Sequence, residues 1–161
     1  MNKNIEKELN KQINEEMYSA YLYLAMAAWF EQKSLDGFGN WMEKQAEEEM
    51  EHAMKFYKYI IERGGHIEFE SIAKPELNIK SALKAFEEAY THEQHITSRI
   101  HFLMNLAKKE SDYPTESMLK WFVDEQLEEE ANTSKAVEQL KMIGESTNGL
   151  MMLDKAMKER E

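Results

Sequence analysis

The stretch Gln45-Ala46-Glu47-Glu48-Glu49-Met50-Glu51-His52 decides the fold, because it combines four carboxylates and one imidazole within one helix-forming segment. Glu49 and His52 are three residues apart, so they project from nearly the same face of a helix. Trp41 and Phe56 continue that face on either side. If the face points at water, the charged run is only solvated surface. If it points into a core, the paired oxygen and nitrogen ligands form half of a metal site in a helical bundle.

The composition indicates one helical domain over residues 1–161, since this length supports a single substantial core. Only two prolines and six glycines interrupt a sequence rich in Ala, Glu, Lys, Leu and Met, which favours long helices over strands. The net charge of −11 argues against nucleic acid as a partner, because its phosphates would be repelled. The absence of cysteine excludes disulfides, iron–sulfur clusters and thiolate zinc sites.

The sequence carries no signal for export or for a membrane. Residues 1–6 lack the apolar core of a signal peptide. No run of about 18 apolar residues occurs, so no membrane span is expected. The absence of thiols is compatible with the cytoplasmic location that we expect.

Apolar residues recur at three- and four-residue steps in four long segments, which predicts helices over residues 5–33, 37–63, 81–110 and 115–143. Short turns join the first helix to the second and the third to the fourth, so each pair should form an antiparallel hairpin. Ser34 or Asp36 is expected to cap the second helix, and the pair Gly64-Gly65 is expected to end it.

The segment between the hairpins, residues 66–80, has no hydrophobic period and contains Pro75. Fully extended, it could span roughly 50 Å, enough to run the length of a helix and let the third helix lie parallel to the second. Residues 149–159 are expected to form a short fifth helix. The predicted fold class is therefore all-α: a four-helix bundle over about 5–143, with one long crossover between helices 2 and 3 and a short C-terminal fifth helix.

Each long helix carries a carboxylate within its apolar stripe, near mid-length: Glu16, Glu49, Glu93 and Glu129. Burying one unpaired carboxylate has an idealised cost on the order of 20 kcal/mol, and several kcal/mol even after relaxation. Four in one core are not tolerable unless cations neutralise them. The stripes therefore predict a buried metal centre.

The two predicted hairpins repeat their site positions at an offset of 77 residues, which pairs Glu16 with Glu93, Glu49 with Gln126, and His52 with Glu129. An approximate two-fold axis would bring both halves around one centre. Carboxylates with one imidazole suit Fe(II), Mn(II) or Zn(II) and exclude Cu(I) chemistry. Two ions within about 4 Å of each other, bridged by Glu49, would be the expected geometry. Bridged iron of this kind can deliver two electrons to O₂ in one encounter.

With these residues the sequence resembles the ferritins, specifically the non-haem bacterial and archaeal type, whose bundles are a well-known instance of this ligand pattern. The resemblance covers nearly the whole chain. It rests on four segments taken together: Asn14-Glu15-Glu16-Met17-Tyr18-Ser19-Ala20-Tyr21-Leu22-Tyr23, Ala46 to His52, His92-Glu93-Gln94, and Trp121 to Glu130.

The resemblance implies a role for each matching residue. The first ferroxidase iron would be held by Glu16, Glu49 and His52. Glu49 would bridge to a second iron, which Glu93 and Glu129 would also hold, with Gln126 beside it. A third, nearby iron site would be formed by Glu48, Glu125, Glu128 and Glu129. Tyr23 matches a tyrosine adjacent to the centre, and Trp121 matches a nearby tryptophan.

The resemblance also implies a function, which is iron storage and detoxification. A ferroxidase of this family oxidises Fe(II) with O₂ or H₂O₂ and stores Fe(III) as a hydrous oxide inside a hollow cage of twenty-four subunits. Iron is then the only expected cofactor, and the expected partners are Fe(II), the oxidant and further copies of the chain. No haem, nucleic acid or membrane is expected.

Two alternatives stay open at this stage. A bacterioferritin would bind haem, and Met50 occupies the place of its haem-ligating methionine; but a second Glu-x-x-His would put Glu at 126 and His at 129, where this chain has Gln126 and Glu129. The other alternative is a mineralising or structural cage without fast ferroxidase activity.

Several candidate residues also have simpler interpretations. The histidines outside the motif are expected at the surface or in satisfied core positions: His66, His92, His95 and His101. Trp121 could be a core residue only, and Tyr23 could be a core tyrosine that is hydrogen-bonded to Glu93.

Overall fold

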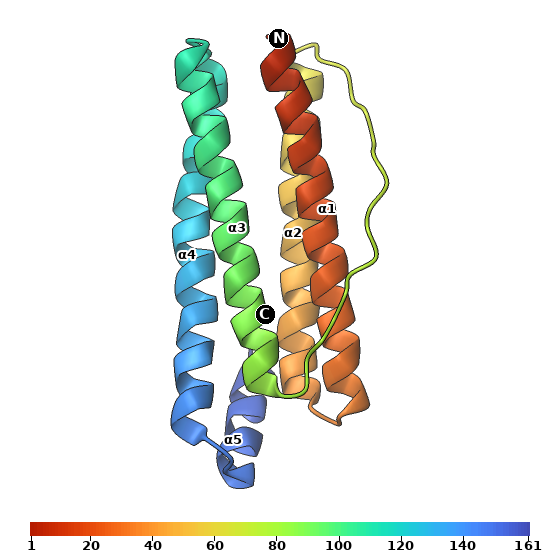
Figure 1. The fold of residues 1–161 in the computed structure, drawn as a ribbon, viewed down its shortest axis with the longest axis vertical. Helices are drawn as coiled ribbons and strands as arrows, with labels where there is room; N and C mark the ends of the chain where they lie inside the picture. Colours follow the sequence, from red (N-terminus) through yellow and green to blue (C-terminus); the bar gives the residue numbers. More distant parts are fainter.

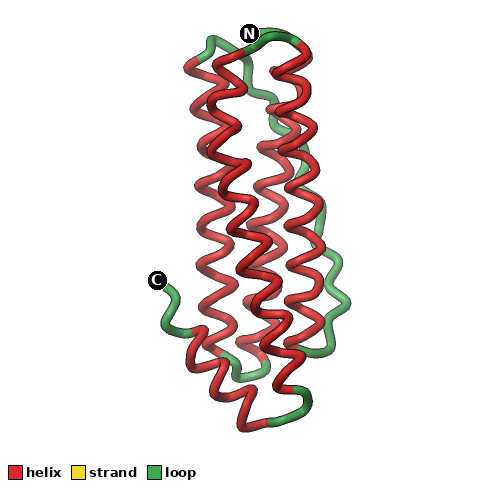
Figure 2. The backbone as a smooth tube through the Cα atoms, turned by 90° about the vertical axis from the view of Figure 1, so that its left-hand side faces the viewer, coloured by secondary structure: helices red, strands yellow, loops and turns green.

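The computed structural model describes all 161 residues and contains five helices and no strand. Four long helices lie side by side along one axis, and a short fifth helix packs at one end of the bundle (Figures 1 and 2). They are α1 (Lys3–Gln32), α2 (Asp36–Glu62), α3 (Ala82–Lys109), α4 (Tyr113–Ile143) and α5 (Thr147–Met157). The predicted all-α bundle with a short fifth helix is confirmed.

The long crossover runs the whole length of the bundle beside α1, from the end of α2 to the start of α3 (Figure 1). Two side chains of α1 hold it in place. The Asn10 side chain donates to the His66 carbonyl at 2.9 Å and accepts from the Glu68 N–H at 2.9 Å, while Asn14 donates to the Ser71 carbonyl at 3.1 Å. Helices α2 and α3 consequently point the same way, as the length of the crossover predicted.

The ends of α2 show one correct and one wrong prediction. Gly64, at φ +67°, lets its N–H and that of Gly65 bond back to the carbonyls of Ile61 and Ile60, which closes the helix as expected. The predicted cap at the other end is wrong. Ser34 adopts φ +58° in the turn, and Leu35 precedes the helix without any side-chain cap bond.

The core consists of two apolar clusters. One lies toward the α5 end and includes Phe30, Phe38 and Phe86, and the other lies toward the opposite end and includes Phe56 and Phe122. In each of the four long helices, buried polar residues fall between the segments that build the two clusters. The fold therefore carries a polar layer across the middle of the bundle.

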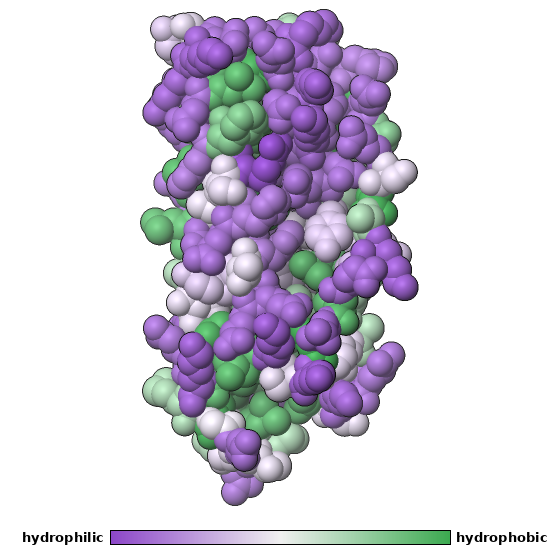
Figure 3. Space-filling view, viewed as in Figure 1, coloured by the Kyte–Doolittle hydropathy of each residue, from purple (hydrophilic) through white to green (hydrophobic).

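The outer surface is mainly hydrophilic on the face that Figure 3 shows, with hydrophobic patches toward the end where α5 lies and another near the opposite end. None of the helices combines the length and the apolar character that crossing a membrane requires. Charged side chains therefore cover the outside of the bundle, as is usual, and a second set of them forms a buried layer, which is unusual.

Candidate metal centre

The polar layer contains one glutamate from each long helix. Glu16, Glu49, Glu93 and Glu129 are each at most 2% exposed, and His52 from α2 lies among them at 4%. The charged run of α2 is thus divided by face, because Glu47 and Glu51 are exposed while Glu49 and His52 point inward. A layer of four buried carboxylates with one imidazole requires compensating charge.

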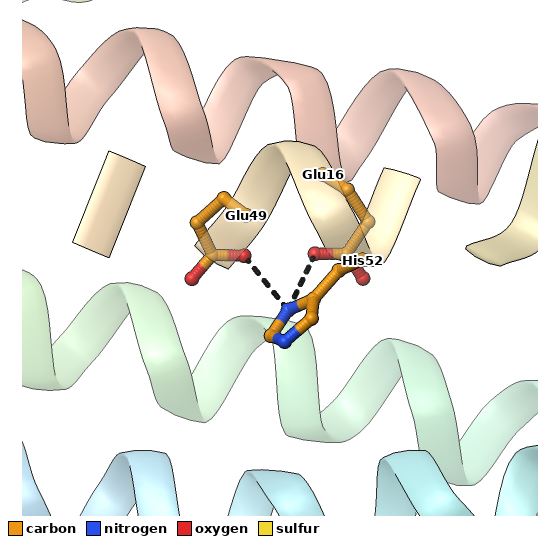
Figure 4. Close-up of side chains that lie close together, drawn as sticks. All are labelled: Glu16, Glu49 and His52. Atoms are coloured by element: carbon orange, nitrogen blue, oxygen red, sulfur yellow. Dashed lines mark hydrogen bonds and ion pairs between the residues drawn. The ribbon is translucent and has the colours of Figure 1, made fainter. Parts of the chain in front are cut away.

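The imidazole of His52 lies between two carboxylates from neighbouring helices (Figure 4). Its Nδ1 atom is 3.3 Å from Oε2 of Glu49 and 3.9 Å from Oε2 of Glu16. These three residues form one group whose ligand atoms all lie within 4.8 Å of one another, and Glu49, Glu93 and Glu129 form a second such group. Glu49 belongs to both groups, which is the arrangement that a bridging carboxylate between two ions requires.

One carboxylate oxygen of this cluster lacks a hydrogen-bond partner. Oε2 of Glu16 is buried and forms no hydrogen bond, and it is the only buried side-chain nitrogen or oxygen in the protein in that condition. A buried carboxylate oxygen without a donor is costly, and a metal ion beside His52 and Glu49 would satisfy it. The oxygen and imidazole ligand set fits Fe(II), Mn(II) or Zn(II).

The acid groups perturb one another strongly. Burial raises the pKa of Glu16 well above its ordinary value, and the neighbouring charge of Glu49 raises it further. Burial likewise raises the pKa of Glu49, with added repulsion from Glu93 and Glu129. Burial and the Glu93 charge raise the pKa of Glu129 to about 8. Without metal the cluster therefore retains protons at neutral pH, and binding cations must release them.

Glu93 is held by hydrogen bonds at both carboxylate oxygens. The Tyr23 hydroxyl donates to Oε1 at 2.5 Å, which confirms the predicted tyrosine–glutamate bond. The Gln126 amide donates to Oε2 at 3.1 Å and to the Glu93 carbonyl at 3.2 Å. Burial, reinforced by the Glu93 charge, raises the pKa of Tyr23 well above its ordinary value, so the phenol keeps its proton and remains a donor.

The four residues of the expected third iron site lie in different environments. Glu125 and Glu129 form a group with His52, whose Nε2 is 3.9 Å from Glu125 Oε1. Glu48 is instead paired with Arg160 at 2.9 Å, and Glu128 is exposed. The structure therefore brings together half of that set.

Two buried glutamines were not assigned a role from the sequence. Gln12 donates to Glu16 Oε1 at 2.9 Å. Gln45 donates to Glu49 Oε1 at 3.1 Å and to Glu129 Oε2 at 2.7 Å. The sequence held a signal for these contacts, because each glutamine stands four residues before a glutamate of the predicted centre, the spacing at which helical side chains meet.

The other histidines belong to none of the three groups of ligand atoms. His92 shares a 2.6 Å hydrogen bond with Ser19, and burial lowers its pKa to about 4, so it is neutral. His95 pairs with Glu15 at 3.0 Å. Trp121 is not a core residue, since it is 39% exposed; its ring lies 5.5 Å from that of His52, under the Lys55 ammonium.

The chain is similar in sequence to known proteins over nearly its whole length. A family model described as a ferritin-like domain matches residues 6–143. The chain is 44% identical over 158 residues to the bacterial non-heme ferritin of Campylobacter jejuni, covering 98% of this chain and 95% of that protein. It is 39% identical over 160 residues to the bacterial non-heme ferritin of Staphylococcus aureus strain MRSA252, covering 99% and 96%.

Solved structures agree with the sequence matches. The open pore ferritin from the archaeon Archaeoglobus fulgidus superposes with a TM-score of 0.99 at 44% identity, covering 100% of this chain and 99% of that one. A humanized archaeal ferritin superposes with a TM-score of 0.99 at 46% identity, covering 100% and 98%.

Proposed function

Because the chain belongs to the ferritin family of iron-storage proteins, we propose that it is a ferroxidase, which oxidises Fe(II) at the polar layer before storing Fe(III) as a hydrous oxide. The observation that carries this proposal is the sharing of Glu49 between two buried acid groups, one of which contains the unpartnered oxygen of Glu16. Such a site draws in two cations together, and two adjacent Fe(II) ions can supply two electrons at once.

The electron count of the proposed reaction is simple. Two Fe(II) ions lose one electron each, and these two electrons with two protons convert O₂ to H₂O₂, or convert H₂O₂ to two waters. The residues of the chain bind, orient and exchange protons. Glu16 and His52 bind on one side, Glu93 and Glu129 bind on the other, and Glu49 binds both ions.

Proton release is part of binding. The raised pKa values of the buried glutamates mean that these groups carry protons before metal arrives. Tyr23 and Gln126 keep Glu93 oriented throughout, because each donates to a different oxygen of that carboxylate. The loaded centre is thus assembled by exchanging protons for cations on a fixed set of oxygens.

We also propose the third iron site, built around Glu125 and Glu129. Both already lie with His52 in one group of ligand atoms. Burial raises the pKa of Glu125, and the charges of Glu128 and Glu48 raise it further against the opposing effect of His52. For Glu48 to bind an ion here, it must exchange its Arg160 partner for the metal.

The cage of twenty-four subunits is proposed on family grounds together with the surface. Large apolar side chains such as Leu127, Met142 and Met152 are each at least 75% exposed, and contacts between subunits would cover such side chains. The cytoplasmic location stays a prediction from the sequence.

The test is aerobic addition of Fe(II) to the metal-free protein, with O₂ followed at an electrode and the iron that stays in solution measured after centrifugation. We expect fast O₂ consumption and a soluble amber core. Glu49→Gln, which keeps the side-chain shape but removes the shared charge, should lose the fast phase. Oxidation at the buffer-only rate with precipitated iron would refute the proposal.

No comparison supports the two alternatives, since the matched relatives are named as non-heme ferritins. Met50 is 42% exposed in a groove that Met17, Leu24 and Ile72 also line. A haem absorption band in the purified protein would favour the bacterioferritin alternative. Normal mineral growth without a fast oxidation phase would favour the cage that lacks ferroxidase activity.

A further inference from the structure

Two fully buried amides connect the metal centre to arginines that lie outside it. On α1, Gln12 donates from Nε2 to Glu16, and its Oε1 accepts from Nε of Arg99 at 3.3 Å. On α2, Gln45 donates from Nε2 to Glu49 and Glu129, and its Oε1 accepts from a terminal nitrogen of Arg160 at 3.0 Å. Each amide therefore lies between an arginine and a ligand carboxylate.

The two arrangements match in further details, although the arginines come from unrelated parts of the chain. Arg99 lies on α3, and Arg160 follows α5. Each guanidinium also pairs with a glutamate at the edge of the bundle, and each lies over an aromatic ring. The pairs are Arg99 with Glu8 at 3.3 Å and Phe102 at 5.3 Å, and Arg160 with Glu48 at 2.9 Å and Trp41 at 4.4 Å. The same arrangement of arginine, glutamine and glutamate therefore occurs on both helices of the first hairpin, α1 and α2.

Hydrogen-bond chemistry explains what the arrangement does. A guanidinium can only donate, a carboxylate that has released its proton to bind metal can only accept, and a glutamine amide has one end of each kind. With arginine on one side and carboxylate on the other, only one amide orientation satisfies both. The reversed amide would put its oxygen against Glu49 and Glu129 and its NH₂ against Arg160. The arginine therefore fixes the amide with its donors directed at the metal ligands.

Both arginines are themselves held in place. The side chain of Arg160 is 17% exposed, and it also donates to the Trp41 carbonyl at 3.1 Å. The Asn40 amide binds the Arg160 carbonyl at 3.1 Å, which fastens the segment after α5 to α2. The side chain of Arg99 is 20% exposed. Both guanidinium groups are largely buried and have several partners, which distinguishes them from the mobile ion pairs of an open surface.

We propose that Arg99 and Arg160 are positioning residues for the metal centre, acting through Gln12 and Gln45 to hold Glu16 and Glu49 ready for two cations. This inference rests on the proposed function, since it assumes that these carboxylates bind metal. Without the arginine the amide can turn its oxygen toward the carboxylate, which then loses its donor and its fixed orientation. Metal ions would bind a less ordered set of ligands more weakly.

The direction in which metal affinity changes when an arginine is removed distinguishes a positioning role from simple charge repulsion. Removing a nearby positive charge should, by Coulomb attraction alone, strengthen the binding of a cation. Loss of orientation should weaken it. Arg99→Gln and Arg160→Gln are therefore expected to lower the affinity of the centre about tenfold, the low end of what lost partners of metal ligands usually cost.

The experiment is calorimetric titration of the assembled, metal-free protein with Zn(II), which has no redox chemistry. Lys11→Gln is the control for Arg99, because the Lys11 ammonium also pairs with Glu8, at 2.8 Å, but forms no hydrogen bond with the Gln12 amide. Lys158→Gln is the control for Arg160, because its exposed side chain lies in the same segment. Both controls should bind Zn(II) like the unmodified protein. Arg160→Lys, which keeps a donor-only group, should regain part of the lost affinity.

Visible spectra of Co(II) bound in place of Zn(II) add a readout of ligand geometry. The Co(II) bands should shift in the two arginine variants and stay unchanged in the two lysine variants. Unchanged or tighter Zn(II) binding in both arginine variants, with unchanged Co(II) bands, would overturn the inference while leaving the metal centre intact. Zn(II) binding that Glu49→Gln does not alter would overturn the proposed function and this inference with it.

Discussion

At the scale of single residues, the centre depends on carboxylates that the fold would otherwise not tolerate. Glu49 is shared between two groups of ligand atoms, and Glu16 keeps one oxygen without any donor. An apolar residue at either position would avoid the free-energy cost of burying a carboxylate. Stability alone therefore does not account for these glutamates. Binding of two cations does account for them, and it can be tested one residue at a time.

The variant His52→Ala combined with Glu16→Ala removes two of the three ligands of the first group. We expect fast iron oxidation to slow by tenfold or more, in line with the loss that follows when metal ligands lose their support. Stopped-flow absorbance after mixing with Fe(II) in air measures the rate. Native mass spectrometry should show that assembly is retained. A double variant that oxidises iron at the normal rate would mean that the centre lies elsewhere.

The metal-free protein should lose stability as the pH rises. The pKa of Glu129 is about 8 in the folded protein, against an ordinary 4.5, so between these values the folded state binds more protons than the unfolded state. Stability then falls with increasing pH, by a few kcal/mol across that window. Urea unfolding with a chelator at pH 5, 6.5 and 8 measures this trend.

The variant Glu129→Gln provides the control for the pH dependence, because it removes the titrating group and keeps its shape. Its unfolding midpoint should vary less with pH than that of the unmodified protein. Added Zn(II) should restore the stability of the unmodified protein at pH 8. A stability that rises steadily from pH 5 to 8 without metal would contradict the buried-acid interpretation.

Much of the residue-scale detail could be predicted from sequence, because the stripe positions of Glu16, Glu49, Glu93 and Glu129 follow from helical periodicity alone. Arg99 and Arg160 could not, because their contacts depend on how distant elements pack. The amide of Gln45 reaches Arg160 across 115 residues of chain. The pairing of Glu48 with that arginine was missed for the same reason.

At the scale of elements, hydrophobic periodicity predicted all five helices, and the structure differs from the prediction only at helix ends. Helix α4 begins at Tyr113, earlier than the predicted residue 115, because Asp112 caps it by accepting from the Thr115 N–H at 3.1 Å. The cap predicted at Ser34 failed because the backbone of that turn is left-handed there. Ends depend on turn geometry, which periodicity does not report.

The docking of α5 on α2 depends on Gly37, where a Cβ atom would lie 1.6 Å from the carbonyl oxygen of Asp154. Gly37→Ala should displace α5 and lower the free energy of unfolding by about 1–3 kcal/mol. Gly39→Ala is the matched control, since its Cβ meets only the flexible Glu31 side chain. Thermal unfolding of both variants checks this. Equal melting temperatures would show that α5 does not pack closely against α2.

At the scale of the whole molecule, the two apolar clusters enclose the polar layer from both ends, and its four glutamates are buried. That arrangement excludes bulk water from the carboxylates and strengthens their mutual interaction. The pattern of stripes predicted the bundle and its long crossover. The number of subunits could not be predicted from the physics of one chain, and it rests on family membership.

The assembled protein should have a native mass of about 460 kDa, corresponding to twenty-four chains of 19.0 kDa. The exposed apolar side chains on α4 and α5 should be buried in that assembly, which stabilises it. Native mass spectrometry or light scattering measures the mass directly. A monodisperse species of one or two chains at micromolar concentration would contradict the cage.

We propose that the polar layer holds two metal ions bridged by Glu49. Anomalous diffraction from crystals soaked in Zn(II), or in Fe(II) without oxygen, tests it most directly. We expect two peaks in the middle of the bundle, both within bonding distance of Glu49, one beside Glu16 and His52 and the other beside Glu93 and Glu129. A single ion, or ions found only at the protein surface, would contradict a bridged pair at Glu49.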